Sequence, residues 1–386
     1  MCRRTPSLHR PVQPLNFLRV FIFLASSLLA PSSLVQAEVV DAPAEIVEAI
    51  EAAMTAYETP GLSVAVIDQG ALTWARGFGV CQEGDERPVT VETLFQAASI
   101  SKPVSAACAL RFVDQGKLTL DDDINDRLVS WKLPPSEKAA GRKITLRWLL
   151  CHGGGITVHG FRGYAPGEAV PSLLQILDGQ PPANSKAIRV DLRPGNVFRY
   201  SGGGYTILQQ LLIDVAGQPF AEIMRTNVLE AVGMRQSTFL QPLPEERRSE
   251  AATGHRRGRV PIDGKYHTYP ELAAAGLWTT PSDLARFAIA VQDEVTGRST
   301  SLFSESLAQE MLRPQVKPHI GLGFFLAGKE ASERFSHGGA NEGFRCELLA
   351  YRTTGQGAVV MTNSDTGGRA AAEVLKAIGD FYRWPK

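Results

Sequence analysis

The chain has 386 residues, of which 44% are hydrophobic and 21% are charged, enough for a large core in one domain or two intertwined ones. Its 40 basic and 40 acidic residues give zero formal net charge. Nothing in this balance indicates the strongly basic face that a nucleic-acid partner favours, so we expect no nucleic-acid partner.

The first 37 residues have the composition of a secretory signal peptide. They hold four arginines, no acidic residue and the apolar run FLRVFIFLASSLLA. Val35 and Ala37 are small residues at the positions of a cleavage site. The apolar run is short for a membrane span and is interrupted by Arg19, which disfavours an uncleaved anchor. We therefore predict cleavage after Ala37, export across the inner membrane to the periplasm or the extracellular space, and no stable membrane span afterwards.

The next segments predict a helix, a hairpin and a second helix. Apolar residues recur at helical spacing in EIVEAIEAAMTAY, and two β-rich runs then flank residues 68–70, which carry the turn sequence Asp-Gln-Gly. Residues 99–113 are rich in alanine and aliphatic side chains, and Gly116 can end this second helix. Pro103 must lie in the first turn of that helix, because deeper inside it would break the helix.

The middle of the chain is predicted to be mostly helices and long loops. TLRWLLCHGGGI has the pattern of a short helix that ends in a glycine cluster. YTILQQLLIDVAG places its leucines on one helical face, with Gly217 as the stop. Thr280 is the expected N-cap of another helix, with Pro281 at its first position.

Strands return near the C-terminus, where a hairpin is predicted around residues 354–357 and an amphipathic helix follows. The sequence thus predicts an α+β fold whose antiparallel sheet is built from both chain ends, flanked by helices, with a mostly helical region inserted. In this interpretation residues 38–386 form one domain. Residues 38–95 and 320–386 supply its sheet part, and residues 96–319 supply the helical part.

The cysteine and histidine patterns predict neither a metal site nor a cofactor. Cys2 leaves with the predicted signal peptide, and the other four cysteines form no CxxC pair. An exported chain permits a disulfide, but the sequence assigns none. His152 and His159 lie seven residues apart, and no HExxH or HxH motif occurs.

One stretch, QAASISKPVSAACAL, combines two serines with a lysine in an apolar segment. Residues three apart share a helix face, so Ser99 and Lys102 point the same way, whereas Ser101 and Lys102 do not. A hydroxyl at a helix start meets free N–H groups, which favour an oxyanion. Burial can lower the pKa of Lys102 enough for it to accept a proton. The alternative is a capping serine followed by a surface lysine.

Two glycine-rich segments add candidate residues. RYSGGGYTILQQLL places Tyr200 just before an amphipathic helix, although a tyrosine there can also be a core residue. FSHGGANEGF places His337 before Gly338 and Gly339, where a substrate can approach the backbone, although such a pair is more often a turn.

Together these segments resemble the serine β-lactamase and penicillin-recognising superfamily. They are most similar to its branch of class C β-lactamases, D-alanyl-D-alanine carboxypeptidases and esterases. That family carries Ser-x-x-Lys, Tyr-x-Asn and Lys/His-x-Gly motifs. Residues 99–102 match the first motif, residues 200–202 match the second except for its last position, and residues 337–339 match the third. The resemblance extends over roughly residues 46–382.

The resemblance implies a serine hydrolase that works through an acyl-enzyme on a small-molecule or peptide substrate, and the predicted signal peptide makes it a secreted one. Ser99 would be the nucleophile, and Lys102 and Tyr200 would share the proton transfers, with the identity of the base left open. The backbone N–H groups of Ser99 and Ala340 would form the oxyanion hole. His337 would position a carboxylate or belong to the proton network.

One departure from the family pattern bears on the substrate. The family's second motif usually ends in asparagine, whose amide holds the acyl-side amide of a penicillin or peptide, whereas this chain has Gly202. His337 in place of lysine is mostly neutral at pH 7. Both changes disfavour efficient β-lactam hydrolysis and leave an ester, a small amide or a D-amino-acid peptide as the expected substrate.

Two other functions compete with this interpretation. CHGGGI resembles the HGGG oxyanion segment of α/β-hydrolase lipases, but no Gly-x-Ser-x-Gly accompanies it. Glycines 153–155 are then expected to form a structural turn. A non-catalytic binding or scaffold protein that keeps the fold is the second alternative, and it would be favoured by loss of Ser99, Lys102 or Tyr200, all of which are present.

Overall fold

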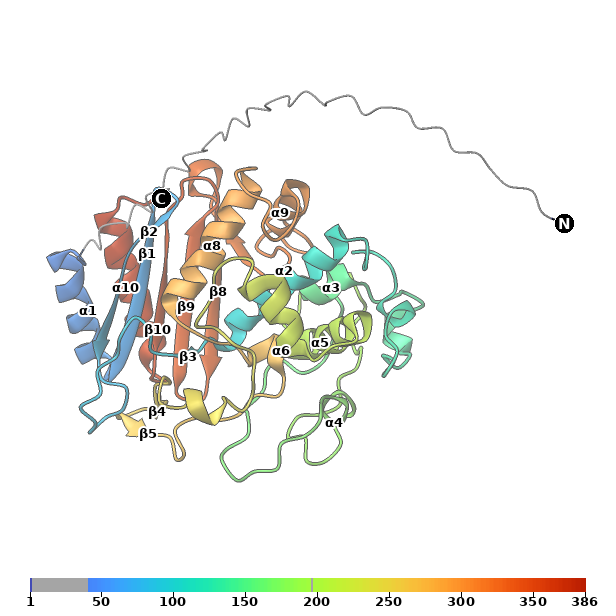
Figure 1. The fold of residues 1–386 in the computed structure, drawn as a ribbon, viewed down its shortest axis with the longest axis horizontal. Helices are drawn as coiled ribbons and strands as arrows, with labels where there is room; N and C mark the ends of the chain where they lie inside the picture. Colours follow the sequence, from blue (N-terminus) through green and yellow to red (C-terminus); the bar gives the residue numbers. More distant parts are fainter. Residues whose placement is uncertain (2–40, 196) are drawn as a thin grey trace. The chain divides into compact units, whose positions relative to one another are not determined.

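An antiparallel sheet organises the protein in the computed structural model, which describes residue 1, residues 41–195 and residues 197–386 (Figure 1). Apart from Met1, the predicted signal peptide lies outside these residues. In the described chain the sheet has six strands in the order β2-β1-β10-β9-β8-β7. Its strands are β1 (Gly61–Asp68), β2 (Ala71–Gly79), β7 (Phe325–Ala327), β8 (Arg334–Asn341), β9 (Phe344–Tyr351) and β10 (Gly357–Thr362).

The two chain ends meet at the centre of this sheet. β1 pairs with β10 from Leu62 opposite Thr362 to Ile67 opposite Gly357. Asn363 ties the same junction together, because its side-chain oxygen accepts the Gly61 N–H at 2.8 Å and its amide donates to the Cys81 carbonyl at 3.0 Å. The prediction of an α+β fold with a sheet from both chain ends is therefore confirmed, as are its two hairpins.

One face of the sheet is covered by the first and last helices. Helices α1 (Ala44–Ala56) and α10 (Gly367–Phe381) lie side by side on it, as Figure 1 shows in blue and red. Their apolar stripes pack against the outward side chains of β1, β2 and β10, because an amphipathic helix must bury one face. Trp74 of β2 donates its indole N–H to the Tyr382 hydroxyl at 2.9 Å and so closes this layer.

The opposite face carries α8 (Pro281–Val295) and, beyond it, the helical region (Figure 1). That region contains most of the larger hydrophobic core. Its other helices are α2 (Ser101–Asp114), α3 (Leu146–Leu150), α4 (Leu173–Asp178), α5 (Gly202–Ala216), α6 (Phe220–Met224), α7 (Leu272–Ala275) and α9 (Glu305–Met311). Two short strand pairs, β3 (Phe95–Gln96) with β6 (Trp278–Thr279) and β4 (His255–Arg256) with β5 (Val260–Pro261), complete the elements that concern the site.

Local signals place the helix ends as the sequence predicts, with one difference. The Thr280 hydroxyl accepts the Asp283 N–H at the start of α8, and Gly217 ends α5 in a left-handed conformation. The helix expected from Ser99 begins two residues later, because residues 98–100 form a separate 3₁₀ turn before α2. Ser99 therefore lies on a turn at the mouth of the helix, and Pro103 lies in its first turn.

Two further features follow from the described residues. None of their helices is at once long enough and apolar enough to span a bilayer. The four cysteines within them, Cys81, Cys108, Cys151 and Cys346, are buried and unpaired, and burial raises the pKa of Cys108 to about 12 and that of Cys151 to about 11. These thiols are inert core side chains, as expected for Cys108.

Candidate active site

Ser99 and Lys102 meet at the start of α2. The Lys102 Nζ lies 2.9 Å from the Ser99 Oγ and 2.8 Å from the carbonyl oxygen of Ala274 in α7. The side chain of Ser99 is partly exposed, whereas Lys102 is only 2% exposed. The structure thus brings together a reachable hydroxyl and a buried amine, one helical turn apart.

Burial changes the acid–base character of Lys102. Removing the ammonium from water disfavours its charged form and lowers the pKa of Lys102 to about 7. Within the described part of the chain its hydrogen-bond partners are a hydroxyl and a carbonyl, and none is a carboxylate. A neutral amine keeps one N–H for the Ala274 carbonyl and offers its lone pair to the Ser99 O–H.

Ser101 has a different task. Its hydroxyl donates to the Ala98 carbonyl at 2.6 Å and accepts the Leu277 N–H at 3.0 Å. Both bonds are buried, so the hydroxyl joins the Ser99 turn to the strand segment after α7. Ser101 is a structural residue whose hydroxyl proton is already donated to the Ala98 carbonyl. Ser99, in contrast, is the serine whose hydroxyl bonds to Lys102.

Tyr200 completes the cluster from the loop before α5. The Lys102 Nζ lies 5.0 Å from the centre of the Tyr200 ring. Burial raises the pKa of Tyr200 to about 12, and hydrogen bonding with the Ser99 side chain offsets part of this rise. The phenol is therefore protonated near neutral pH and can donate or relay a proton next to Ser99 and Lys102.

His337 enters the same space from β8. Its Nδ1 lies 2.6 Å from the Gly338 carbonyl oxygen, so Nδ1 carries the proton and donates. The other nitrogen, Nε2, is buried and has no hydrogen-bond partner in the described chain. Burial, with the nearby Lys102, lowers the pKa of His337 to about 3. The imidazole is therefore neutral, with a free acceptor.

The three residues after His337 lie where β8 runs past the Ser99 turn. A Cβ on Gly339 would lie 2.2 Å from the Ala97 carbonyl oxygen, so only glycine permits this approach. Gly338 faces the other side of the sheet, where a Cβ would lie 2.7 Å from the Glu347 carboxyl. Ala340 is exposed, and β7 pairs with β8 only as far as Ser336. The backbone from His337 to Ala340 thus lies beside Ser99.

Gly202, the departure from the family pattern, is surrounded by another side chain. A Cβ there would lie 2.9 Å from Cε2 of Phe161 and 3.1 Å from the His159 carbonyl oxygen. Phe161 therefore fills the space that an asparagine side chain would need. Next to it lies a cavity of about 420 Å³ lined by residues 157–162 and 184–187. His159 links this cavity to the site, because its ring centre is 5.0 Å from that of Tyr200.

The site also uses residues that the sequence did not single out for it. The Ala274 carbonyl holds Lys102, Phe161 fills the side-chain space at Gly202, and His152 packs its ring 4.3 Å from that of Tyr200. From the sequence, His152 is named only in the search for a metal site and within the CHGGGI segment, not as a neighbour of Tyr200. Nothing in the spacing of these three residues indicates their contacts, because each depends on segments far apart in the chain.

The HGGG alternative is wrong for this fold. α/β-Hydrolases are built on a mostly parallel sheet, whereas the described strands of the main sheet pair antiparallel. Glycines 153–155 instead form the expected turn, in which the Gly153 carbonyl accepts the Gly195 N–H and the Gly155 carbonyl accepts the Asp191 N–H.

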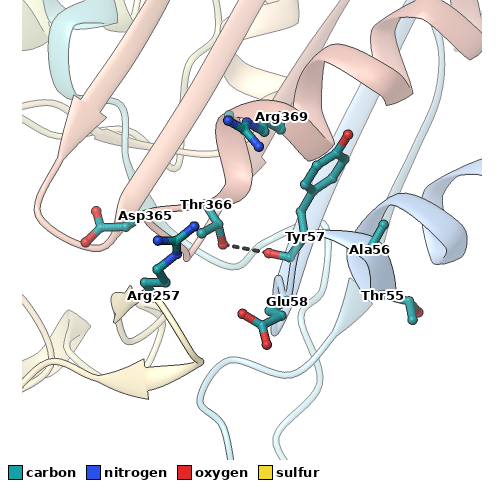
Figure 2. Close-up of a pocket in the computed structure, with 9 residues that line it drawn as sticks. Thr55, Ala56, Tyr57, Glu58, Arg257, Asp365, Thr366 and Arg369 are labelled. Carbon is teal, nitrogen blue, oxygen red and sulfur yellow. Dashed lines mark hydrogen bonds between the residues drawn. The ribbon is translucent and has the colours of Figure 1, made fainter.

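A larger cleft lies away from these residues. It has a volume of about 890 Å³ and lies between the C-terminal end of α1, the N-terminal end of α10 and the β4–β5 turn (Figure 2). At its floor the Thr366 hydroxyl donates to the Tyr57 carbonyl at 2.6 Å, which holds the two helices together. None of the candidate site residues lines this cleft, so the larger cavity is not the candidate active site.

Comparisons with known proteins agree with the fold. The Beta-lactamase family model matches residues 46–382, so the chain belongs to the beta-lactamase family. It is 27% identical over 340 residues to penicillin-binding protein 4 of Amycolatopsis lactamdurans, with 82% of this chain and 84% of the relative aligned.

Two solved structures share the fold at lower identity. The D-amino acid amidase from Ochrobactrum anthropi SV3, complexed with L-phenylalanine amide, superposes with a TM-score of 0.69 at 22% identity, over 87% of this chain and 99% of the amidase. EstCE1, a hydrolase with promiscuous acyltransferase activity, gives 0.67 at 18% identity, over 88% and 98% of the two chains. The same fold therefore occurs both in an amidase and in a hydrolase with acyltransferase activity.

Proposed function

We propose that this protein is a serine hydrolase that forms an acyl-enzyme on Ser99, with esters or small D-amino-acid amides and peptides as its preferred substrates. The observation that carries the proposal is the buried amine of Lys102, which lies 2.9 Å from the Ser99 Oγ and has a pKa of about 7. A base with a pKa near the working pH is the most effective partner for a hydroxyl nucleophile.

In this mechanism the neutral Lys102 takes the proton of Ser99 while the Oγ bonds to the substrate carbonyl carbon. The oxyanion that forms is stabilised by the backbone N–H groups of Ser99 and Ala340, each donor contributing about 10²–10³ in rate. The intermediate then expels an alcohol or amine, which takes a proton that passes from Lys102 through the Tyr200 hydroxyl. Water then enters in place of the leaving group and gives its proton to Lys102 through Tyr200 while its oxygen bonds to the acyl carbon. The Ser99 Oγ leaves and takes a proton back from Lys102.

The two flanking groups support different parts of this sequence. Because burial raises the pKa of Tyr200 to about 12, Tyr200 acts as the relay and Lys102 acts as the base. His337 is neutral, so it supplies no charge for a substrate carboxylate. Its unpartnered Nε2 accepts a hydrogen bond from the leaving group or from water, which favours the proton network over carboxylate binding.

The substrate preference rests on the missing side chain at Gly202, whose space is filled by Phe161. Without an asparagine amide, the site lacks a donor and acceptor for an acyl-side amide, and Phe161 supplies apolar surface instead. An ester or a small amide without an acyl-side amide group does not need these hydrogen bonds. The amidase with the same fold acts on D-amino acid amides, as its name states.

Replacing each of the two serines by alanine tests which one is the nucleophile. Ser99→Ala should abolish hydrolysis of a p-nitrophenyl ester and labelling by a fluorophosphonate. Ser101→Ala should keep most of the activity but lower the free energy of unfolding by about 1–3 kcal/mol, because the buried Leu277 N–H loses its acceptor. The reverse outcome would move the nucleophile to Ser101. A wild type inert to esters, fluorophosphonates and penicillins would favour the non-catalytic scaffold instead.

The pH dependence tests the base. Only the neutral amine accepts a proton, so kcat/KM for a short ester should fall about tenfold per unit below pH 7 and reach a plateau above it. Lys102→Arg should lower kcat/KM by a factor of about 10²–10⁴ at every pH, because arginine stays charged and accepts no proton. Rates between pH 5 and pH 10, with circular dichroism as the control for folding, provide the measurement. An inflection near pH 10 would contradict a lowered lysine pKa.

Restoring the missing amide tests the substrate preference. Gly202→Asn alone forces the Phe161 ring to move, so the informative variant is the double substitution Gly202→Asn/Phe161→Ala. We expect its ratio of β-lactam to short-ester turnover to rise by about tenfold, as one recovered hydrogen bond allows. Phe161→Ala alone is the matched control and should leave the ratio nearly unchanged. An unaltered ratio in the double variant would show that these positions do not set the preference.

Export is the remaining part of the proposal and rests on the signal-peptide pattern of residues 1–37. Expression in a Gram-negative host should yield a periplasmic or secreted protein whose intact mass corresponds to a chain that begins at Glu38. Val35→Asp/Ala37→Asp should block processing, because the cleavage site requires small residues. A full-length wild-type protein retained in the cytosol would contradict export.

A further inference from the structure

We propose that His152 is a positioning residue for Tyr200, acting mainly through its hydrogen bonds to the N–H groups of Arg199 and Ser201 on either side of this tyrosine, with ring packing as a smaller contribution. The inference rests on the proposed function, in which the Tyr200 hydroxyl relays a proton. His152 itself need not touch the substrate. Its task is to keep the phenol within reach of Ser99 and Lys102.

The hydrogen bonds of His152 flank Tyr200. The His152 carbonyl oxygen accepts the Arg199 N–H at 3.0 Å, and its Nδ1 accepts the Ser201 N–H at 3.1 Å. His152 thus accepts the N–H groups of both residues that flank Tyr200. The Ser201 hydroxyl adds a bond of 2.8 Å to the Thr157 carbonyl and caps α5 through the Gly204 N–H, so the loop has little freedom to move away.

The ring of His152 supports the phenol directly. The two ring centres are 4.3 Å apart with an interplanar angle of 34°, and His152 is only 3% exposed. Tyr205 and Phe198 contact the other sides of the imidazole, with centre distances of 5.4 and 5.9 Å. Because close-packed aromatic side chains leave few alternative rotamers, this packing restricts the orientation of Tyr200.

The backbone at His152 is unusual for its residue type. Its φ of 58° lies in the left-handed region, just after α3, where glycine or asparagine normally ends a helix. The next two N–H groups, of Gly153 and Gly154, both donate to the Trp148 carbonyl and complete the turn. Glycine at residue 152 would satisfy this geometry without strain but would offer neither the acceptor nor the ring. A non-glycine residue here is thus consistent with a role for its side chain.

The imidazole keeps its acceptor while Lys102 changes charge. The Ser201 bond requires an unprotonated Nδ1, which places the proton of the neutral ring on Nε2. Burial, together with the neighbouring groups Lys102, His337 and His159, holds the pKa of His152 well below its usual range. The bond to Ser201 is therefore maintained on both sides of the Lys102 titration.

Two substitutions separate the acceptor from the ring. His152→Asn provides an oxygen near the position of Nδ1 and tolerates the left-handed backbone, whereas His152→Phe keeps the ring and removes the acceptor. For a short ester we expect His152→Phe to lower kcat by 10- to 100-fold with KM changed less than about twofold, and His152→Asn to stay within about fivefold of wild type. A folded His152→Asn variant that loses more than 10-fold would overturn the proposal, whether or not His152→Phe folds.

A double-substitution cycle tests whether His152 acts through Tyr200. Added to Tyr200→Phe, the change His152→Phe should cost less than about twofold more in kcat, because the group that it positions is already absent. Multiplicative losses would overturn the proposal. A different result would contradict the proposed function: if Tyr200→Phe keeps the wild-type kcat, the Tyr200 hydroxyl is not the proton relay. Thermal unfolding of each variant serves as the control for stability.

Discussion

The amine of Lys102 is held inside the protein, and much of the architecture around the site serves to keep it there. A buried ammonium without a carboxylate partner is costly, so the group loses its proton near neutral pH. Among the described residues its hydrogen-bond partners are two uncharged groups, the Ser99 hydroxyl and the Ala274 carbonyl. The lack of a charged partner matters for the chemistry, because a carboxylate beside Lys102 would stabilise the ammonium form. Lys102 could then no longer act as a base near neutral pH.

Each layer of the fold contributes one part of this environment. The 3₁₀ turn before α2 presents Ser99, the short helix α7 supplies a carbonyl, and the edge of β8 brings the His337 segment against the turn through Gly339. The loop before α5 delivers Tyr200, tied down by His152 on both flanks. The central pairing of β1 with β10, two segments from opposite chain ends, holds the sheet on which these parts converge.

Much of this arrangement can be predicted from the sequence, because it is encoded locally. Alternating and helical patterns give the hairpins and helices, and the three-residue spacing gives the Ser99–Lys102 pair. The contacts of Ser101, Phe161 and His152 are not accessible in this way. The Ser101 hydroxyl bonds to Leu277, Phe161 occupies space beside Gly202, and His152 meets Tyr200, all across long separations in the chain. Such contacts follow from tertiary packing, which no local pattern records.

Direct titration of the Lys102 side chain tests the central claim. Protein labelled with ¹³C at the lysine ε-carbon would be followed by NMR between pH 5 and pH 11, with the resonance assigned by its absence in Lys102→Arg. The account predicts that this one resonance titrates near pH 7, well below the other lysines. A midpoint above pH 10 would mean that the amine stays charged at neutral pH, and the proposed base would be lost.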